Sequence, residues 1–196
     1  MAENMAPAAA NHTPNGKFSN VYGQWADGGW GMLLTGMETI FYIPKSLNPN
    51  GRNSNQGTTG NVQVSETYLG QPKDVAIMPH TSKIISTITQ EEWKTWASTC
   101  QRSGTPTIVQ LNHPGRQSPA GVGNRSIFSK AIAPSAVKLN FGPSLLAKTA
   151  SALLFGTPRE MTVQEICGEG GLVDQFVEAA KQSFDAGFKG VELHAA

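Results

Sequence analysis

The sequence predicts an α/β fold with parallel strands, because short apolar runs alternate with longer amphipathic segments along its 196 residues. Three of these runs are continuously apolar and end at polar residues, which is typical of strands buried in a parallel sheet. They cover residues 31–35 (GMLLT), 107–111 (TIVQL) and 190–194 (GVELH). The residues expected at the carboxyl ends of these strands are Gly36, Gln110, Asn112 and His194.

A helix is predicted between the first and second strands. Thr89 and Glu92 have the spacing of a capping box, which places the helix over residues 90–102. Gly104 is positioned to end it.

A second helix is predicted between the second and third strands. Its apolar residues recur at helical spacing, and Gly187 stands where the helix should stop. Another capping box, Thr162 with Glu165, predicts the start of a further helix before this one. The glycines of residues 168–171 interrupt that helix. The apolar residues are Leu172, Val173, Phe176, Val177, Ala180 and Phe184.

Two stretches do not fit this regular alternation. Residues 118–159 are rich in Pro, Gly, Ser and Lys, which indicates an excursion with loop or hairpin structure. Residues 37–60 follow a predicted strand end and are rich in Asn, Gly and Ser, as in an insertion that does not belong to the fold.

Composition excludes several classes of function. Fifteen Lys and Arg balance 14 Asp and Glu, so the net charge of +1 argues against a nucleic-acid partner or a charged membrane surface. No apolar stretch is long enough to span a membrane. Cys100 and Cys167 form no disulfide framework, and with four scattered histidines they predict no metal site. We expect a cytoplasmic protein.

Chemistry-bearing residues gather after the second strand, in the run VQLNHPGRQS of residues 109–118. Gln110, Asn112, His113 and Arg116 supply amide and cationic donors at the mouth of a parallel sheet. On spacing alone, a polar loop held by its own hydrogen bonds is the better explanation, in particular for His113 and Arg116.

His194 is the second candidate. A neutral imidazole at a strand end can donate a hydrogen bond to a substrate oxygen and polarise it, although many such histidines are only structural. Glu192 alternates with His194 along the strand, and we expect it to form an ion pair inside the fold.

Four runs together resemble the Old Yellow Enzyme family of FMN-dependent NADH:flavin oxidoreductases. They are YGQWADGGWGMLLTG, VQLNHPGRQSP, DQFVEAAKQSFDAGFKG and GVELHAA. The resemblance implies an eight-fold β/α (TIM) barrel that binds FMN. It also implies an ene-reductase activity, in which a hydride passes from NAD(P)H through FMN to an alkene conjugated to a carbonyl group.

The resemblance also assigns site residues. Gln110 matches the glutamine whose amide hydrogen-bonds the pyrimidine edge of the flavin, and His194 matches the first of two residues that bind the substrate oxygen. Ala2 matches a position beside the flavin that is often Thr, Ser or Cys. Gly36 matches a position whose backbone lies near the flavin.

The length implies an incomplete barrel, since a full one takes about 250 residues. We expect the segments that follow His194 in the family, including its phosphate-binding loops, to be absent. An open parallel sheet leaves unpaired strand edges that favour self-association. The alternative to an enzyme is therefore a non-catalytic fragment or interaction module without stable FMN binding.

The 24 residues of 37–60 have a genetic explanation that can be tested. Deleting them joins LLTG to NVQV, a run ordinary for the family, and 24 codons keep the reading frame. We expect amplification of this junction from cDNA to yield a product shorter by 72 bases, as for a retained intron. A transcript that always contains the 72 bases would mean a genuine surface insertion.

Overall fold

The computed structural model describes residues 14, 16–39, 82–113, 115–118, 120, 128, 130–169 and 171–194. Ala2 and residues 40–81 lie outside this part of the chain. In chain order, the elements are α1 (Gly16–Ala26), β1 (Leu33–Thr39), α2 (Ser82–Cys100), β2 (Thr107–Asn112), the 3-10 helix η3 (Gly115–Gln117), β3 (Ile132–Ala133), α3 (Leu145–Leu154), β4 (Arg159–Glu160), α4 (Val163–Cys167), α5 (Leu172–Ala186) and β5 (Gly190–His194).

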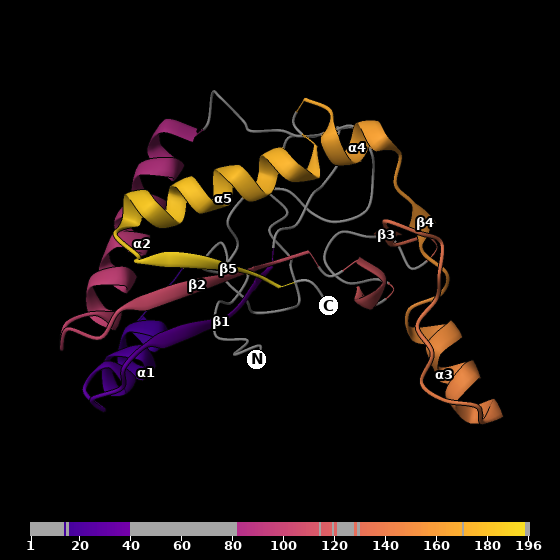
Figure 1. Ribbon diagram of the computed structural model, residues 1–196, viewed down its shortest axis with the longest axis horizontal. Helices are drawn as coiled ribbons and strands as arrows, with labels where there is room; N and C mark the ends of the chain where they lie inside the picture. Colours follow the sequence, from indigo (N-terminus) through magenta and orange to yellow (C-terminus); the bar gives the residue numbers. More distant parts are fainter. Residues whose placement is uncertain are drawn as a thin grey trace.

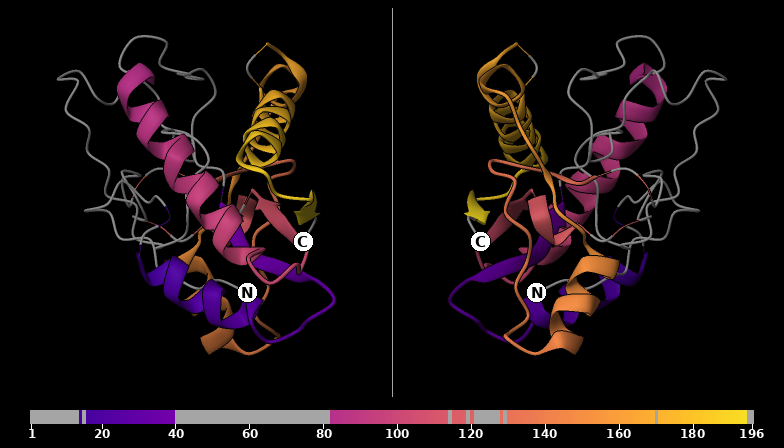
Figure 2. Two further views of the ribbon diagram at one scale, coloured as in Figure 1. Left: turned by 90° about the vertical axis from the view of Figure 1, so that its left-hand side faces the viewer. Right: turned by 90° about the vertical axis from the view of Figure 1, so that its right-hand side faces the viewer.

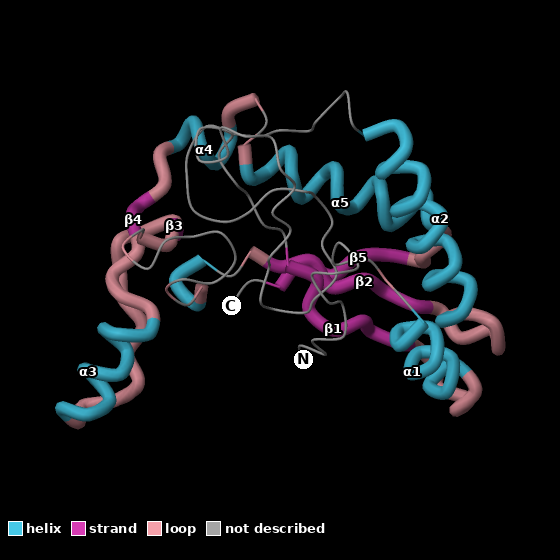
Figure 3. The backbone as a smooth tube through the Cα atoms, turned by 180° about the vertical axis from the view of Figure 1, so that it is seen from behind, coloured by secondary structure: helices cyan, strands magenta, loops and turns pink. Residues whose placement is uncertain are grey.

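The main sheet has the strand order β1-β2-β5, and both of its pairings are parallel. Figure 1 shows these strands side by side, with α5 running above β5. The same order is seen from behind in Figure 3. Strands consecutive in the sheet are joined through helices, which confirms the predicted parallel α/β arrangement.

The first strand is longer than predicted. It was expected to end at Gly36, but β1 continues through Met37 to Thr39, and Met37 is the register partner of Gln110. The register shifts between Leu34 and Met37, so that two residues of β1 face one residue of β2. Backbone pairing with β2 does not depend on side-chain type, which is why the strand crosses the predicted insertion boundary. The rest of that segment, residues 40–60, lies outside the described residues.

Helix α2 also begins earlier than predicted, at Ser82. Thr89 therefore lies within the helix, and the expected capping box at this position is wrong. No Gly or Pro occurs between residues 82 and 100, so nothing in the sequence forces the backbone out of the helix before Thr89. At the other end the helix stops at Cys100, and Gly104 adopts a left-handed φ of 84° in the following turn.

The helix signals near the third strand are confirmed. Thr162 and Glu165 form a reciprocal capping box at the start of α4, which the following glycines separate from α5. Gly187 ends α5 with a φ of 99°, and its N–H donates to carbonyl groups of the last turn. A side chain at this position would strain the backbone, so the glycine fixes the turn into β5.

The excursion contains a helix and two short strands. β3 and β4 pair in parallel, with α3 on the connection between them. Of the two expectations for this segment, loop or hairpin, β3 and β4 do not form a hairpin, because a hairpin pairs its strands antiparallel. In Figure 1, α3 projects away from the main sheet at the lower right.

An aromatic cluster holds α1, α2 and α5 against the main sheet. Trp96 is fully buried at its centre, with ring centroids 5.2–5.3 Å from those of Phe18, Tyr22 and Phe188 in edge-to-face geometry. Figure 2 shows the three helices grouped around the sheet. The remaining buried members are Trp93, Ala97, Cys100, Val109, Leu111 and Ala179.

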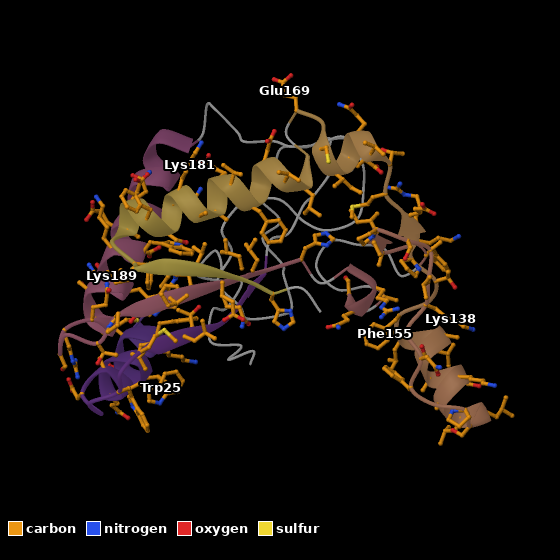
Figure 4. All side chains as sticks on the ribbon, viewed as in Figure 1. Trp25, Lys138, Phe155, Glu169, Lys181 and Lys189 are labelled. Atoms are coloured by element: carbon orange, nitrogen blue, oxygen red, sulfur yellow. The ribbon has the colours of Figure 1, made fainter. Side chains whose placement is uncertain are left out.

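An ion pair joins the segments that follow the carboxyl ends of α1 and α2. The Arg102 guanidinium donates hydrogen bonds to the Asp27 carboxylate, and the Ser103 hydroxyl donates another at 2.7 Å. These bonds, first that from Arg102, hold the pKa of Asp27 below its ordinary value. Figure 4 places the Trp25 side chain at the same end of α1.

None of the helices within the described ranges is long and apolar enough to cross a membrane.

Replacing the central tryptophan should destabilise the fold severely. We expect Trp96→Ala to lower the free energy of unfolding by about 3 to 5 kcal/mol, because it empties the centre of the cluster. Urea denaturation monitored by circular dichroism measures the change. Trp30→Ala is the matched control, since Trp30 is 60% exposed, and it should cost less than about 1 kcal/mol. Equal losses in the two variants would contradict this description of the core.

Candidate functional site

Gln110 lies in the central strand and points away from the aromatic cluster. Val109 and Leu111, its neighbours on β2, are fully buried in that cluster, so strand alternation places Gln110 on the opposite face of the sheet. Its side chain is only 6% exposed. The amide Nε2 donates to Glu192 Oε1 at 3.3 Å, whereas the amide oxygen Oε1 is buried without a hydrogen-bond partner among the described residues.

Glu192 orients the Gln110 amide. The two residues are register partners on β2 and β5, and the carboxylate can accept only from the amide nitrogen. The carbonyl end of Gln110 is therefore the end without a hydrogen-bond partner in the part of the chain that the structure describes. The expected ion pair of Glu192 is not found within the described part of the chain. Its partner is a neutral amide, because Gln110 rather than a cation lies opposite it in the sheet.

His194 lies two residues beyond Glu192, on the same face of β5. It is half-buried, and its Nδ1 atom is buried without a partner among the described residues. Buried polar atoms of native proteins are nearly always hydrogen-bonded. On adjacent strands, one face of this sheet thus carries two buried polar atoms, a carbonyl oxygen and an imidazole nitrogen, that have no hydrogen-bond partner within the described ranges.

On the side of β1, a hydrogen bond at the register shift holds Gln110. The backbone N–H of Gln110 donates to Thr35 Oγ1 at 3.1 Å, and Thr35 is buried. Gly36 follows it at the register shift on the edge strand β1, next to Met37, the register partner of Gln110. Sequence analysis did not assign a role to Thr35, although a glycine inside a strand is a known signal of such a bulge. Ala2 lies outside the described residues.

The loop after β2 separates into a buried and an exposed part. Burial lowers the pKa of His113 to about 4, so this imidazole is neutral at physiological pH. Its Nδ1 atom lies close to Gly115, which also approaches Ala133 of β3. Arg116 is exposed. The role of His113 as a support of the loop stays a prediction.

Together these features define a β/α fold whose candidate site lies on the sheet face opposite its aromatic core. The site lies toward the carboxyl ends of parallel strands, which is where such folds bind small molecules.

Comparison with known proteins identifies the family. Residues 53–196 match the sequence model of the NADH:flavin oxidoreductase / NADH oxidase family, and this chain belongs to that family. The chain is 43% identical over 197 residues to the NADH-dependent flavin oxidoreductase iccE of Talaromyces variabilis, covering 100% of this chain and 39% of the relative. It is 44% identical to the NADH-dependent flavin oxidoreductase iliE of Neonectria sp. (strain DH2), covering 99% of this chain and 21% of that protein.

Solved structures agree on the fold. The Old Yellow Enzyme homologue of Zymomonas mobilis superposes with a TM-score of 0.60 at 19% identity, over 100% of this chain and 42% of that one. Morphinone reductase in complex with tetrahydroNAD superposes equally well, at 22% identity, over 98% of this chain and 43% of that one. The chain therefore adopts part of the Old Yellow Enzyme (β/α)8 barrel. It spans about two fifths or less of the length of these relatives.

The site residues fit the flavin that the family uses. The pyrimidine ring of a flavin carries an imide N–H between two carbonyl groups, and an N–H donor is what the free Gln110 oxygen requires. The buried Nδ1 of His194 has no hydrogen-bond partner among the described residues, so it can bind a polar group of a ligand.

The buried His113 should make stability depend on pH. The unfolded chain protonates this imidazole near its ordinary pKa of 6.5, whereas the folded chain resists protonation until about pH 4. The unfolded state thus binds more protons between these values, and stability falls as the pH falls. Between pH 7.5 and pH 5, we expect the wild type to lose about 2 kcal/mol more unfolding free energy than His113→Gln. Urea denaturation at both pH values measures this, and equal losses would contradict it.

Proposed function

We propose that this chain provides the pyrimidine side of an FMN site and the substrate-oxygen ligand of an NAD(P)H-dependent ene-reductase. The observation that carries this proposal is the carbonyl oxygen of Gln110, which is buried without a hydrogen-bond partner among the described residues. Membership of the NADH:flavin oxidoreductase family supports the cofactor assignment. Because the chain covers only part of its relatives, the complete activity depends on segments that match the rest of them.

Each site residue has a separate task in this proposal. Gln110 accepts a hydrogen bond from the flavin imide through its Oε1 atom, while Glu192 prevents the amide from turning its nitrogen outward. The backbone around Gly36 lies beside Gln110 in the sheet and offers a surface without a side chain. Ala2 is proposed to lie beside the flavin, on the basis of the family motif alone.

His194 binds the activating oxygen of the substrate. An imidazole N–H that donates to a carbonyl oxygen stabilises the negative charge that develops there during reduction. When bound, FMN supplies the transfer of a hydride from NAD(P)H to the β-carbon of an alkene conjugated to such a carbonyl group. The position of His194, two residues beyond Glu192 on the same sheet face, brings the substrate oxygen next to the proposed flavin.

We further propose that the protein acts in the cytoplasm on small molecules. Both cysteines are free thiols, one buried and one exposed, which fits a reducing compartment.

A second candidate function is a non-catalytic module that lacks stable FMN binding. It is favoured by the uncovered face of the last β/α unit, where Val173, Val177 and Phe184 of α5 and Leu193 of β5 are exposed. Such a face should bind a further protein surface. A colourless protein with a defined oligomeric state would support this candidate, and size-exclusion chromatography with absorbance detection distinguishes it from the first.

Flavin binding tests the proposal directly. We expect the purified 196-residue chain to retain less than one equivalent of FMN, but to bind added FMN in a fluorescence titration. Gln110→Leu should weaken this binding roughly tenfold, since it removes the acceptor of a buried hydrogen bond. Gln24→Leu, at an exposed position of α1, is the matched control and should bind FMN like the wild type. Unchanged binding in Gln110→Leu would refute the assigned role of this residue.

A further inference from the structure

Glu192 is the only acidic residue of the two strands that carry the candidate site. Neither β2 (TIVQLN) nor β5 (GVELH) contains a Lys or an Arg. Glu192 is half-buried, and it lies on the same sheet face as Gln110 because the two residues are register partners. Figure 1 shows their strands side by side. A carboxylate in a partly buried position interacts with nearby charge more strongly than a carboxylate in water.

No cation of the described residues forms an ion pair with this carboxylate. Its hydrogen-bond partner is the Gln110 amide Nε2 at 3.3 Å, which is a neutral donor. A neutral donor orients the carboxylate but does not cancel its negative charge. Within the described part of the chain, a single amide group therefore separates this charge from Gln110 Oε1, the proposed flavin acceptor.

A flavin changes its charge on the side that Gln110 is proposed to hold. The ring system of an oxidised flavin is neutral at neutral pH, and two-electron reduction adds negative charge to its pyrimidine side. A fixed negative charge near this side opposes the reduced form, because like charges repel, and it has little effect on the oxidised form. The charge of Glu192 and its effect on the orientation of the Gln110 amide are thus two separate properties.

We propose that the negative charge of Glu192 lowers the reduction potential of FMN bound at Gln110. This inference rests on the proposed function, since it requires FMN to bind there. Glu192 is a positioning residue for the Gln110 amide, and its charge in addition makes the bound cofactor a stronger reductant. The consequence for the site is a wider range of acceptors, which includes compounds that are harder to reduce.

The affinities of the 196-residue chain for oxidised and for reduced FMN test this inference. Calorimetric titrations measure both dissociation constants, the second with FMN reduced by dithionite in the absence of oxygen. Glu192→Gln removes the charge but keeps an oxygen acceptor for the Gln110 amide. We expect it to lower the ratio of the Kd for reduced FMN to the Kd for oxidised FMN about tenfold. This change corresponds to a reduction potential that is higher by about 30 mV.

Two further variants separate the charge from the hydrogen bond and from the net charge of the protein. Glu192→Asp keeps the charge, although its shorter side chain gives up the hydrogen bond to Gln110, and its ratio should stay within about threefold of the wild-type ratio. Glu91→Gln removes a carboxylate that is 67% exposed on α2, which packs on the other face of the sheet. Its ratio should equal that of the wild type, because solvent and salt screen this charge. Circular dichroism checks that each variant is folded.

The outcomes distinguish this inference from the proposed function. An unchanged ratio in Glu192→Gln, with oxidised FMN still bound, would overturn the inference and leave the proposed function in place. An equal fall of the ratio in Glu91→Gln would also overturn it, because the effect would then come from net charge. Failure of the wild type to bind FMN in either form would overturn the proposed function together with the inference.

Discussion

Packing of Trp96 against one face of the parallel sheet is the constraint on which the rest of this structure depends. The helices α1, α2 and α5 meet the sheet through this cluster, and β2 contributes Val109 and Leu111 to it. Because strand side chains alternate, burying these two residues fixes Gln110 on the other face. The position of a polar amide in the site is thus a consequence of how the apolar core is packed. Loss of the core would remove the site, whereas changes at the site leave the core intact.

Two further hydrogen bonds fix the Gln110 backbone and decide which end of its side-chain amide has no partner in the described part of the chain. Thr35 accepts the Gln110 backbone N–H at the bulge, and Glu192 accepts from the side-chain amide. An amide has a donor end and an acceptor end, and only the carboxylate neighbour decides which of them faces a ligand. The free group is therefore an acceptor, which suits an imide N–H of a flavin. His194 adds a second unsatisfied atom on the neighbouring strand.

The sequence allowed the parallel strands, the capping box at Thr162 and the helix stop at Gly187 to be predicted, because each depends on local residue type. The start of α2 was misplaced, since a capping pattern at Thr89 has no effect where the preceding residues continue the helix. The extension of β1 depends on pairing with a strand about 70 residues away, which local patterns do not report. Glu192 was assigned to an ion pair because its cross-strand partner, Gln110, is defined only by the sheet register. The assignments of Gln110, His194, Gly36 and Ala2 to a flavin site rest on the family motifs and remain predictions.

In the proposed site, Glu192 acts on the flavin through the Gln110 amide. A double-mutant cycle on FMN affinity measures this most directly, by comparing Glu192→Ala in the wild-type chain and in a Gln110→Leu background. Glu192→Ala should weaken FMN binding severalfold when Gln110 is present, and it should have no further effect when Gln110 is replaced. Equal effects in the two backgrounds would contradict it, and so would an affinity for FMN that neither substitution changes.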